Sequence, residues 1–228
     1  MNNISFLELL LDIDSIIIGE RIKGGVFRPC QQTIPSSTIE GALRHRFNLE
    51  ATVPAVGILE EGSYLMKEFV YGVQDRMLGN AKVPIFTNYL TPNRAHCEKI
   101  RAKIYIPDNQ YNACKGISKN AEFYMGALKT KGFGKCRIIR MDKRDFMIKQ
   151  GLLNVKVFSD EVKYFSIEPI SPIYGLLFKP DPKMQFMKGT YQKSLFPESL
   201  VMAPEVFLKE ERCKATGKSK TKEMFYDV

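Results

Sequence analysis

The feature that most constrains the fold is a regular alternation of apolar and polar residues near the start of the chain. Within residues 5–18 an apolar side chain recurs at every second position, with acidic residues between. The alternating apolar residues are Leu7, Leu9, Leu11 and Ile13. A period of two places these side chains on one face of an extended strand. The sequence therefore predicts a strand over residues 5–18 with one buried face.

A glycine-rich basic stretch at residues 126–138 predicts a loop that feeds a strand. Gly132 and Gly134 flank Phe133, so the backbone can adopt positive φ and approach a ligand closely. Phe133 fits either a base-stacking ring or an anchor for the loop. The cations of this stretch, which suit a polyanion, are Lys129, Lys131, Lys135 and Arg137. A flexible hairpin turn with solvated lysines is the alternative, and the spacing matches no mononucleotide-binding fingerprint.

A second glycine-rich basic turn follows the first strand, at residues 19–25. It contains Arg21, Lys23, Gly24 and Gly25, and Arg28 comes shortly after it. Both turns combine cations with glycine, so both are candidates for contact with phosphate groups.

A helix is predicted after the second turn. Ser37 stands three residues before Glu40, which is the pattern of a capping box. Arg44, His45 and Arg46 fall mostly outside the apolar side of this helix. They fit either a solvated helix face or a surface that contacts phosphate. The apolar side consists of Ile39, Ala42, Leu43 and Phe47.

The net charge of +9, with a pI of about 9.2, favours an anionic partner. Residues 127–149 hold eight cations against two acids, and residues 20–46 hold five against two. The net charges of these windows, +6 and +3, add up to the whole excess of +9. The positive charge is therefore concentrated in the two glycine-rich turns and the first helix.

The cysteines predict free thiols, because they are five in number, scattered and never in C-x-x-C spacing. The N-terminus has no basic segment before an apolar run, so neither a signal peptide nor a membrane span is predicted. We therefore expect a cytoplasmic protein. The sequence has only two histidines and no carboxylates at the spacing of metal ligands, so it offers few ligands for a metal site.

The rest of the chain is predicted to form mainly strands. Residues 50–95 predict hairpins or an inserted lobe, because glycine and proline punctuate short apolar runs. Further strands are predicted at residues 100–106, 136–141, 155–158, 162–167 and 173–178.

Three parts are expected on this basis. A first domain spans residues 1–150 and includes the lobe and the glycine-rich loop. A β-rich second unit at residues 151–208 packs on it. The basic tail at residues 209–228 is expected to be disordered unless a partner orders it.

Two segments resemble the RAMP superfamily of CRISPR-associated proteins. Residues 129–138, KTKGFGKCRI, resemble the basic G-F-G loop of that superfamily and the strand after it. Residues 33–44, TIPSSTIEGALR, resemble the entry to the first helix in type III effector subunits, with Ser36 in place of the usual glycine. The resemblance implies an α+β fold that is ferredoxin-like, or RNA-recognition-motif-like, with a β-rich second half.

Within the superfamily the chain most resembles the capping subunit, which binds the 5′ handle of the guide RNA in type III effector complexes. It shares a G-E-R-x-x-G-G turn, the helix motif and a mid-chain glycine loop. Backbone subunits generally carry a target-cleaving aspartate after the first strand, and residues 19–34 contain none. Processing endonucleases often use a histidine near the first helix, where His45 lies, but their glycine loop usually lies near the C-terminus.

The combined expectation is a non-catalytic RNA-binding subunit that holds CRISPR RNA and contacts other CRISPR effector subunits, without a membrane, a metal or a small-molecule cofactor. The alternatives are an endonuclease that uses His45, a backbone-type subunit without the aspartate, and a protein scaffold. The predicted RNA-binding residues are Arg21, Lys23, Gly24, Gly25, Arg28, Arg44, Arg46, Lys129, Lys131, Gly132, Phe133, Gly134, Lys135 and Arg137.

Overall fold

The computed structural model describes residues 3–19, 27–49, 52–72, 84–114, 116–181 and 189–209. Its helices are the α-helix α1 (Ser36–Phe47) and the 3-10 turns η1 (Asp108–Cys114), η2 (Lys129–Lys131), η3 (Val162–Phe165) and η4 (Glu205–Phe207). Its strands are β1 (Asn3–Ile13), β2 (Phe27–Arg28), β3 (Val56–Leu59), β4 (Tyr64–Tyr71), β5 (Ile85–Pro92), β6 (Ile100–Pro107), β7 (Glu122–Tyr124), β8 (Lys135–Leu152), β9 (Val157–Phe158), β10 (Glu168–Ser171), β11 (Tyr174–Pro180), β12 (Gly189–Leu195) and β13 (Leu200–Pro204).

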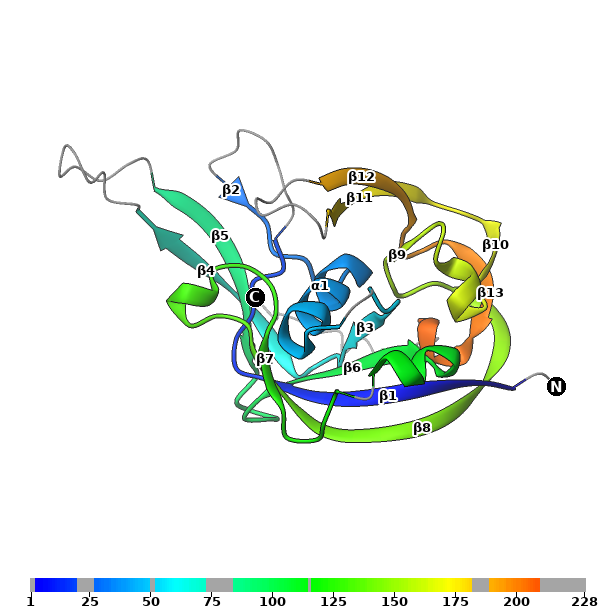
Figure 1. Cartoon of the computed structure of the whole chain (residues 1–228). Coiled ribbons are helices and arrows are strands. Elements are labelled where there is room, and N and C mark those ends of the chain that lie inside the picture. Colours follow the sequence, from blue (N-terminus) through cyan, green and yellow to red (C-terminus); the bar gives the residue numbers. More distant parts are fainter. Residues whose placement is uncertain are drawn as a thin grey trace, which may run out of the picture.

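A large antiparallel sheet forms the centre of the described structure (Figure 1). Its strand order is β10-β13-β8-β1-β6-β3, and β7 pairs with β8. Two smaller sheets, with the orders β11-β12-β9 and β2-β5-β4, flank it. α1 contacts β9 and β11 of one smaller sheet, and Phe133 of the glycine-rich loop contacts β4 and β5 of the other.

The central strand of the large sheet is β1, which pairs with β6 on one side and β8 on the other. Leu9, Leu11 and Ile13 are fully buried, which confirms the alternation predicted from the sequence. The strand ends at Ile13 rather than at residue 18. The chain leaves the sheet there, and Ile16 N donates to Leu90 O of β5 at 2.9 Å.

The second face of β1 is covered at its N-terminal half. Phe6 is fully buried, and its ring contacts those of Phe165 and Phe207, which come from the C-terminal part of the chain. Glu8 is only 3% exposed and accepts a hydrogen bond from the Tyr105 hydroxyl at 3.1 Å. Burial raises the pKa of Tyr105, and the nearby Glu8 raises it further, so the phenol keeps its proton and donates.

The strands β1 and β3 and the connecting helix α1 form a split βαβ unit, because β6 lies between the two strands. The apolar side of α1 packs on the sheet as predicted, with Ile39, Ala42 and Leu43 buried and Phe47 partly buried. Between β6 and β8 the described residues form η1, β7 and η2 rather than a second α-helix. A full ferredoxin-like repeat would have a helix there.

The capping box predicted at Ser37 is wrong. α1 begins at Ser36, the N-cap position is Pro35, and no side chain caps the helix. Glu40 turns inward instead of returning to the helix start, and its Oε1 accepts a hydrogen bond from Ala55 N at 3.5 Å. The buried partners of Glu40, which lie far away in the sequence, decide its orientation.

The longest strand, β8, links different parts of the fold (Figure 1). It pairs with β7 at its start, with β1 along its middle and with β13 at its end. A register shift opposite Leu10 and Leu11 leaves Ile139 as an extra residue, which is a β-bulge. A bulge increases local twist, and β8 curves around the sheet accordingly. The strand predicted at residues 136–141 is confirmed and extends to Leu152.

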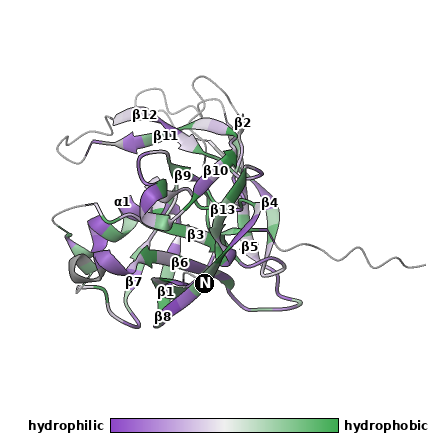
Figure 2. Cartoon of the chain, turned by 90° about the vertical axis from the view of Figure 1, so that its right-hand side faces the viewer, coloured by the Kyte–Doolittle hydropathy of each residue, from purple (hydrophilic) through white to green (hydrophobic). Residues whose placement is uncertain are grey.

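The C-terminal part of the chain contributes to two sheets. β13, which is hydrophobic along most of its length, joins the large sheet beside β8 (Figure 2). β9, β11 and β12 form one of the smaller sheets. Residues 162–167 were predicted as a strand, and this is wrong: η3 forms there and ends at Ser166, whose φ is +52°. β3, within the stretch predicted as a lobe, belongs to the large sheet, whereas β4 and β5 form a hairpin.

The described cysteines are all free thiols, as predicted. Cys30, Cys114 and Cys136 are buried, and Cys97 is partly exposed. Cys213 lies outside the described residues, as do residues 210–228 of the predicted tail. No helix in the described part of the chain is long and apolar enough to cross a membrane.

A buried ionisable cluster joins α1 to the sheet of β9, β11 and β12. Glu40 and Glu161 are 3% and 6% exposed, and their carboxyl groups hydrogen-bond to each other. Lys179 Nζ lies 2.8 Å from Glu161. Burial raises the pKa of Glu40 well above its usual range, and the charge of Glu161 adds to the rise. One shared proton leaves the three groups neutral in total.

The first prediction concerns this shared proton. In the unfolded chain Glu40 titrates near about pH 4.3, so above that pH the folded chain keeps a proton that the unfolded chain has lost. The free energy of unfolding should therefore fall as pH rises through the raised pKa of Glu40. Glu40→Gln should flatten this dependence and raise the melting temperature at pH 8 by about 2–4 °C, the shift expected for about 1 kcal/mol in a chain of this size.

Thermal and urea unfolding at pH 5 and pH 8 measure the effect. Glu98→Gln is the matched control, because Glu98 is exposed. A Glu40→Gln variant that loses stability more steeply than wild type with rising pH would contradict the prediction.

Candidate nucleic-acid interface

The glycine-rich loop is attached to the chain segment that follows β1. Ala127 N donates to Ile17 O at 2.8 Å, and Gly134 N donates to Ser15 O at 2.6 Å. These two bonds close the loop at both ends. The loop therefore projects from a fixed base, with η2 at its tip.

The glycines of the loop have two different roles. Gly126 and Gly134 have φ of +87° and +81°, and an added Cβ would lie 2.4 Å from Ile17 O and 1.9 Å from Met125 O, respectively. Both positions require glycine because another backbone passes so close. Gly132 has φ of +89°, but no atom lies within 4 Å of a Cβ built there. The space beside Gly132 is therefore open to a ligand, while its N–H donates within the loop to Lys129 O at 3.0 Å.

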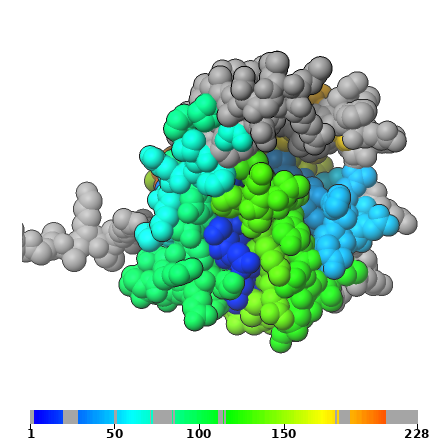
Figure 3. All heavy atoms as spheres, turned by 90° about the vertical axis from the view of Figure 1, so that its left-hand side faces the viewer, coloured from blue at the N-terminus to red at the C-terminus, as the bar shows by residue number. Residues whose placement is uncertain are grey.

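Phe133 packs on the hairpin of β4 and β5. Its ring makes edge-to-face contacts with Phe69 and Tyr89, at centroid distances of 5.2 and 5.3 Å. Such aromatic pairs stabilise by about 0.5–1.5 kcal/mol beyond burial. Phe133 therefore anchors the loop to the hairpin. Figure 3 shows the loop region (bright green) between β4 (cyan) and the segment that includes α1 (light blue).

The predicted cations of the loop differ in their partners. Lys129 and Lys131 are exposed at the tip, and neither has an ion-pair partner in the described part of the chain. Lys135 Nζ lies 3.0 Å from the carboxylate of Glu122, and this hydrogen bond raises the pKa of Lys135. Arg137 is exposed on β8, also without an ion-pair partner among the described residues. Three cations are thus available to an anion.

The C-terminal end of α1 lies next to this loop. Arg46 Nε donates to Glu122 O at 2.7 Å, so Arg46 and Lys135 meet at the same residue. Arg46, His45 and Arg44 also occupy the last turn of α1, where positive charge offsets the negative end of the helix dipole. These residues consequently stabilise the helix whether or not they contact RNA.

Some predicted residues fall outside this geometry. Arg21, Lys23, Gly24 and Gly25 lie outside the described residues. Arg28 is in β2, which pairs in parallel with β5, and its side chain is not described. Gly134 is buried and its main-chain groups bond to Ser15 and Met125, so they are not available to a phosphate.

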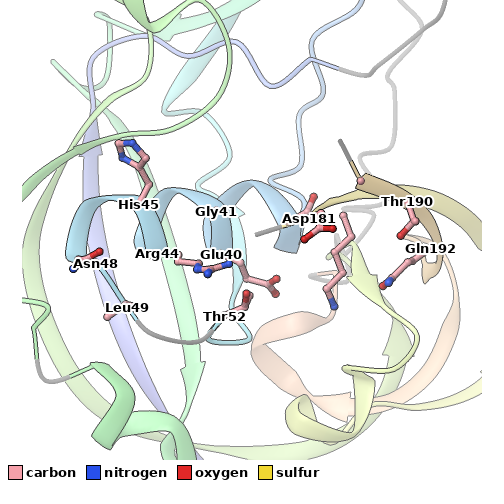
Figure 4. A pocket seen from close by; sticks show the side chains of 13 residues that line it. Glu40, Gly41, Arg44, His45, Asn48, Leu49, Thr52, Asp181, Thr190 and Gln192 are labelled. Carbon is pink, nitrogen blue, oxygen red and sulfur yellow. The ribbon is translucent and has the colours of Figure 1, made fainter. Parts of the chain in front are cut away.

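A cavity of about 970 Å³ lies between α1 and the strands β11 and β12 (Figure 4). Glu40, Arg44 and Thr52 project into it from one side, and Thr190 and Gln192 from the other. The full lining is Ser37, Glu40, Gly41, Arg44, His45, Asn48, Leu49, Thr52, Lys179, Asp181, Gly189, Thr190 and Gln192. Arg44 thus projects into the cavity, the ring of His45 points away from Arg44, and Arg46 bonds to β7 (Figure 4).

The sequence did not reveal this cavity. Its two walls are separated by more than a hundred residues, and the sequence does not show that they meet. One signal was present: Ser37, Gly41, Arg44 and Asn48 recur at helical spacing on α1 and form a polar stripe. Such a stripe also fits ordinary solvent exposure.

One described residue is a candidate for catalysis. His45 is exposed and lines the cavity, where it could act as a general base. Among the described residues, no group of three or more histidine, cysteine, aspartate or glutamate side chains could hold a metal ion. The arrangement is best suited to binding an anion at the loop and a polar group in the cavity.

No protein-family model matches the sequence, and no curated protein matches it. Solved structures do resemble the fold. One is a chain in the cryo-EM structure of the Type III-B Cmr-beta bound to cognate target RNA and AMPPnP, with a TM-score of 0.57 and 8% identity. Another is a chain of the Type III-B Cmr-beta bound to cognate target RNA, with a TM-score of 0.56 and 10% identity. Each match covers 86% of both chains.

These matches extend over most of the chain, including the C-terminal part that the sequence motifs did not reach. At such low identity they establish a shared fold. The predicted α+β, RAMP-like fold class is confirmed: the protein is a strand-rich chain with a curled antiparallel sheet and few helices in its described part.

Proposed function

We propose that the chain is a non-catalytic RNA-binding subunit of a type III CRISPR effector complex. In this proposal it holds the CRISPR RNA, at its 5′ handle, and contacts neighbouring subunits. The glycine-rich loop and the end of α1 form the RNA-binding surface.

The observation that carries the proposal is the open, basic tip of the loop. Open space beside Gly132 lets a ligand approach the tip closely, and Lys129 and Lys131 flank it with exposed charge. Exposed cations that a phosphate can approach closely form a favourable site for it. The loop is also held at both ends, so little conformational entropy is lost when it binds.

The shared fold adds support. The similar Cmr-beta chains come from complexes bound to cognate target RNA. Fold alone does not define function, so the assignment depends on the loop and its charges. A subunit that follows the RNA backbone through these groups would need no catalytic residue.

An endonuclease remains the second candidate because of His45. It lies beside Arg44, and both line the cavity. A single histidine between two arginines also fits a phosphate-contacting helix end. A backbone-type subunit without the cleaving aspartate would share the same binding surface and differ in its position in the complex.

The second prediction separates the two kinds of glycine. Gly132→Val should strain the exposed tip, where φ is +89°, and leave the core folded. It should weaken binding of single-stranded repeat RNA about tenfold or more, because the valine side chain would hold phosphate away from Lys129 and Lys131, and a charge-assisted hydrogen bond contributes about 1.5–3 kcal/mol. Gly134→Val should fail to fold, since its Cβ would clash with Met125 O. Filter binding and circular dichroism measure the two effects. A folded Gly132→Val variant with wild-type affinity would contradict the role of Gly132.

The third prediction concerns salt. The dissociation constant should increase with salt, and Lys129→Ala or Lys131→Ala should each lower the slope of log K against log salt by about 0.7, the value per phosphate contact on a single strand. Lys149→Ala is the matched control, because Lys149 Nζ is paired with Glu205 at 2.5 Å on a distant part of β8. A flat salt response of the wild type would remove the electrostatic basis of the proposal.

The fourth prediction tests the enzyme alternative. Wild-type protein should leave repeat RNA intact with or without a divalent metal, and His45→Ala should bind nearly as well as wild type. Replacing a general base typically costs about 10²–10⁴-fold in rate. Gel analysis of labelled repeat RNA gives the answer. Site-specific cleavage that His45→Ala abolishes would favour the endonuclease instead.

A further inference from the structure

The cavity between α1 and the β11–β12 strands is unusual for the interface of a helix and a sheet. Such interfaces are normally close-packed with apolar side chains. Here a polar side of the helix faces a polar side of the sheet, and a space of about 970 Å³ separates them. This volume lies within the range of sites that enclose small organic ligands, about 300–1,000 Å³.

The groups that line the cavity are balanced in charge and in hydrogen bonding. Arg44 contributes positive charge and Asp181 a carboxyl group, while Lys179 and Glu40 belong to the buried cluster with Glu161. The amide of Gln192 provides both a donor and an acceptor. Three hydroxyl groups do the same, from Ser37, Thr52 and Thr190. A balanced set of this kind fits the uncharged polar edge of a nucleobase better than a further phosphate.

The position of the cavity connects it to the RNA surface. Arg44 and Arg46 are two residues apart on a helix, which places them on opposite sides of α1. Arg46 bonds to β7 beside the glycine-rich loop, and Arg44 projects into the cavity. A helix is about 10 Å across, so a strand that crosses the end of α1 passes from the loop to the cavity within a few nucleotides.

We propose that this cavity receives the base of one unpaired nucleotide of the bound RNA, with Gln192 contacting the base and Arg44 contacting the adjacent phosphate. The inference rests on the proposed RNA-binding function. The loop supplies affinity that is independent of sequence, and the cavity makes binding at one position depend on the base.

The test compares the full-length protein with Gln192→Leu, which keeps the size of the side chain and removes its hydrogen bonds. Gln150→Leu is the matched control, because Gln150 is exposed on β8. The probes are twelve-nucleotide homopolymers of the four RNA bases, measured by filter binding across a salt series. A further probe is an oligouridine that contains 4-thiouridine, crosslinked and mapped by mass spectrometry.

Wild type should bind the four homopolymers with affinities that differ about fivefold or more, as expected when one or two hydrogen bonds discriminate between bases. Gln192→Leu should reduce this spread to about twofold or less, leave the salt slope unchanged and keep the fold by circular dichroism. Gln150→Leu should match wild type. Crosslinks should map to residues 189–193 as well as to the loop.

Other outcomes overturn the inference in distinguishable ways. If all four affinities are unchanged by Gln192→Leu and crosslinks are confined to the loop, RNA binds without using the cavity, and a side chain of a partner protein becomes its expected occupant. If no homopolymer binds, the proposed function fails together with this inference.

Discussion

The rest of the structure depends on β1 being enclosed between β6 and β8. Along most of its length its odd-numbered residues lie in one hydrophobic core. On its other face Phe6 packs against rings from the C-terminal part of the chain, and Glu8 is also buried. A buried carboxylate is costly unless it is paired. Glu8 is paired in this way: the Tyr105 hydroxyl donates to it, and guanidinium nitrogens of Arg140 and Arg144 each lie 3.4 Å from its Oε1.

The position of the candidate RNA surface depends on β1. The residues just after β1 offer carbonyl groups to the glycine-rich loop, and the loop is further held by Phe133 on the β4–β5 hairpin. α1, whose apolar side packs on the same sheet, brings Arg46 to β7. Core packing and the placement of the basic groups are therefore parts of one arrangement.

Patterns local in sequence were enough to predict the strands around β1 and β6, the apolar side of α1 and the loop before β8. Predictions failed where the decisive partner is distant. Ser37 and Glu40 match a capping box, but Glu40 is buried beside Glu161 and accepts a hydrogen bond from Ala55 N. In the sequence Gly132 and Gly134 look equivalent. Only the fold shows that Met125 O lies against Gly134. The cavity has walls from distant segments, so no local pattern could reveal it.

The attachment of the loop at its two ends has a consequence for how this protein can diverge. Gly126 and Gly134 are fixed by backbone contacts, but no atom surrounds the space beside Gly132 at the tip. Substitutions at the exposed residues 129–132 would leave the core and the contacts of Phe133 with the β4–β5 hairpin in place. Selection could therefore alter the ligand preference of the tip with little loss of stability. Substitutions of Gly126 or Gly134 would impair folding, so selection would act against them whatever the ligand.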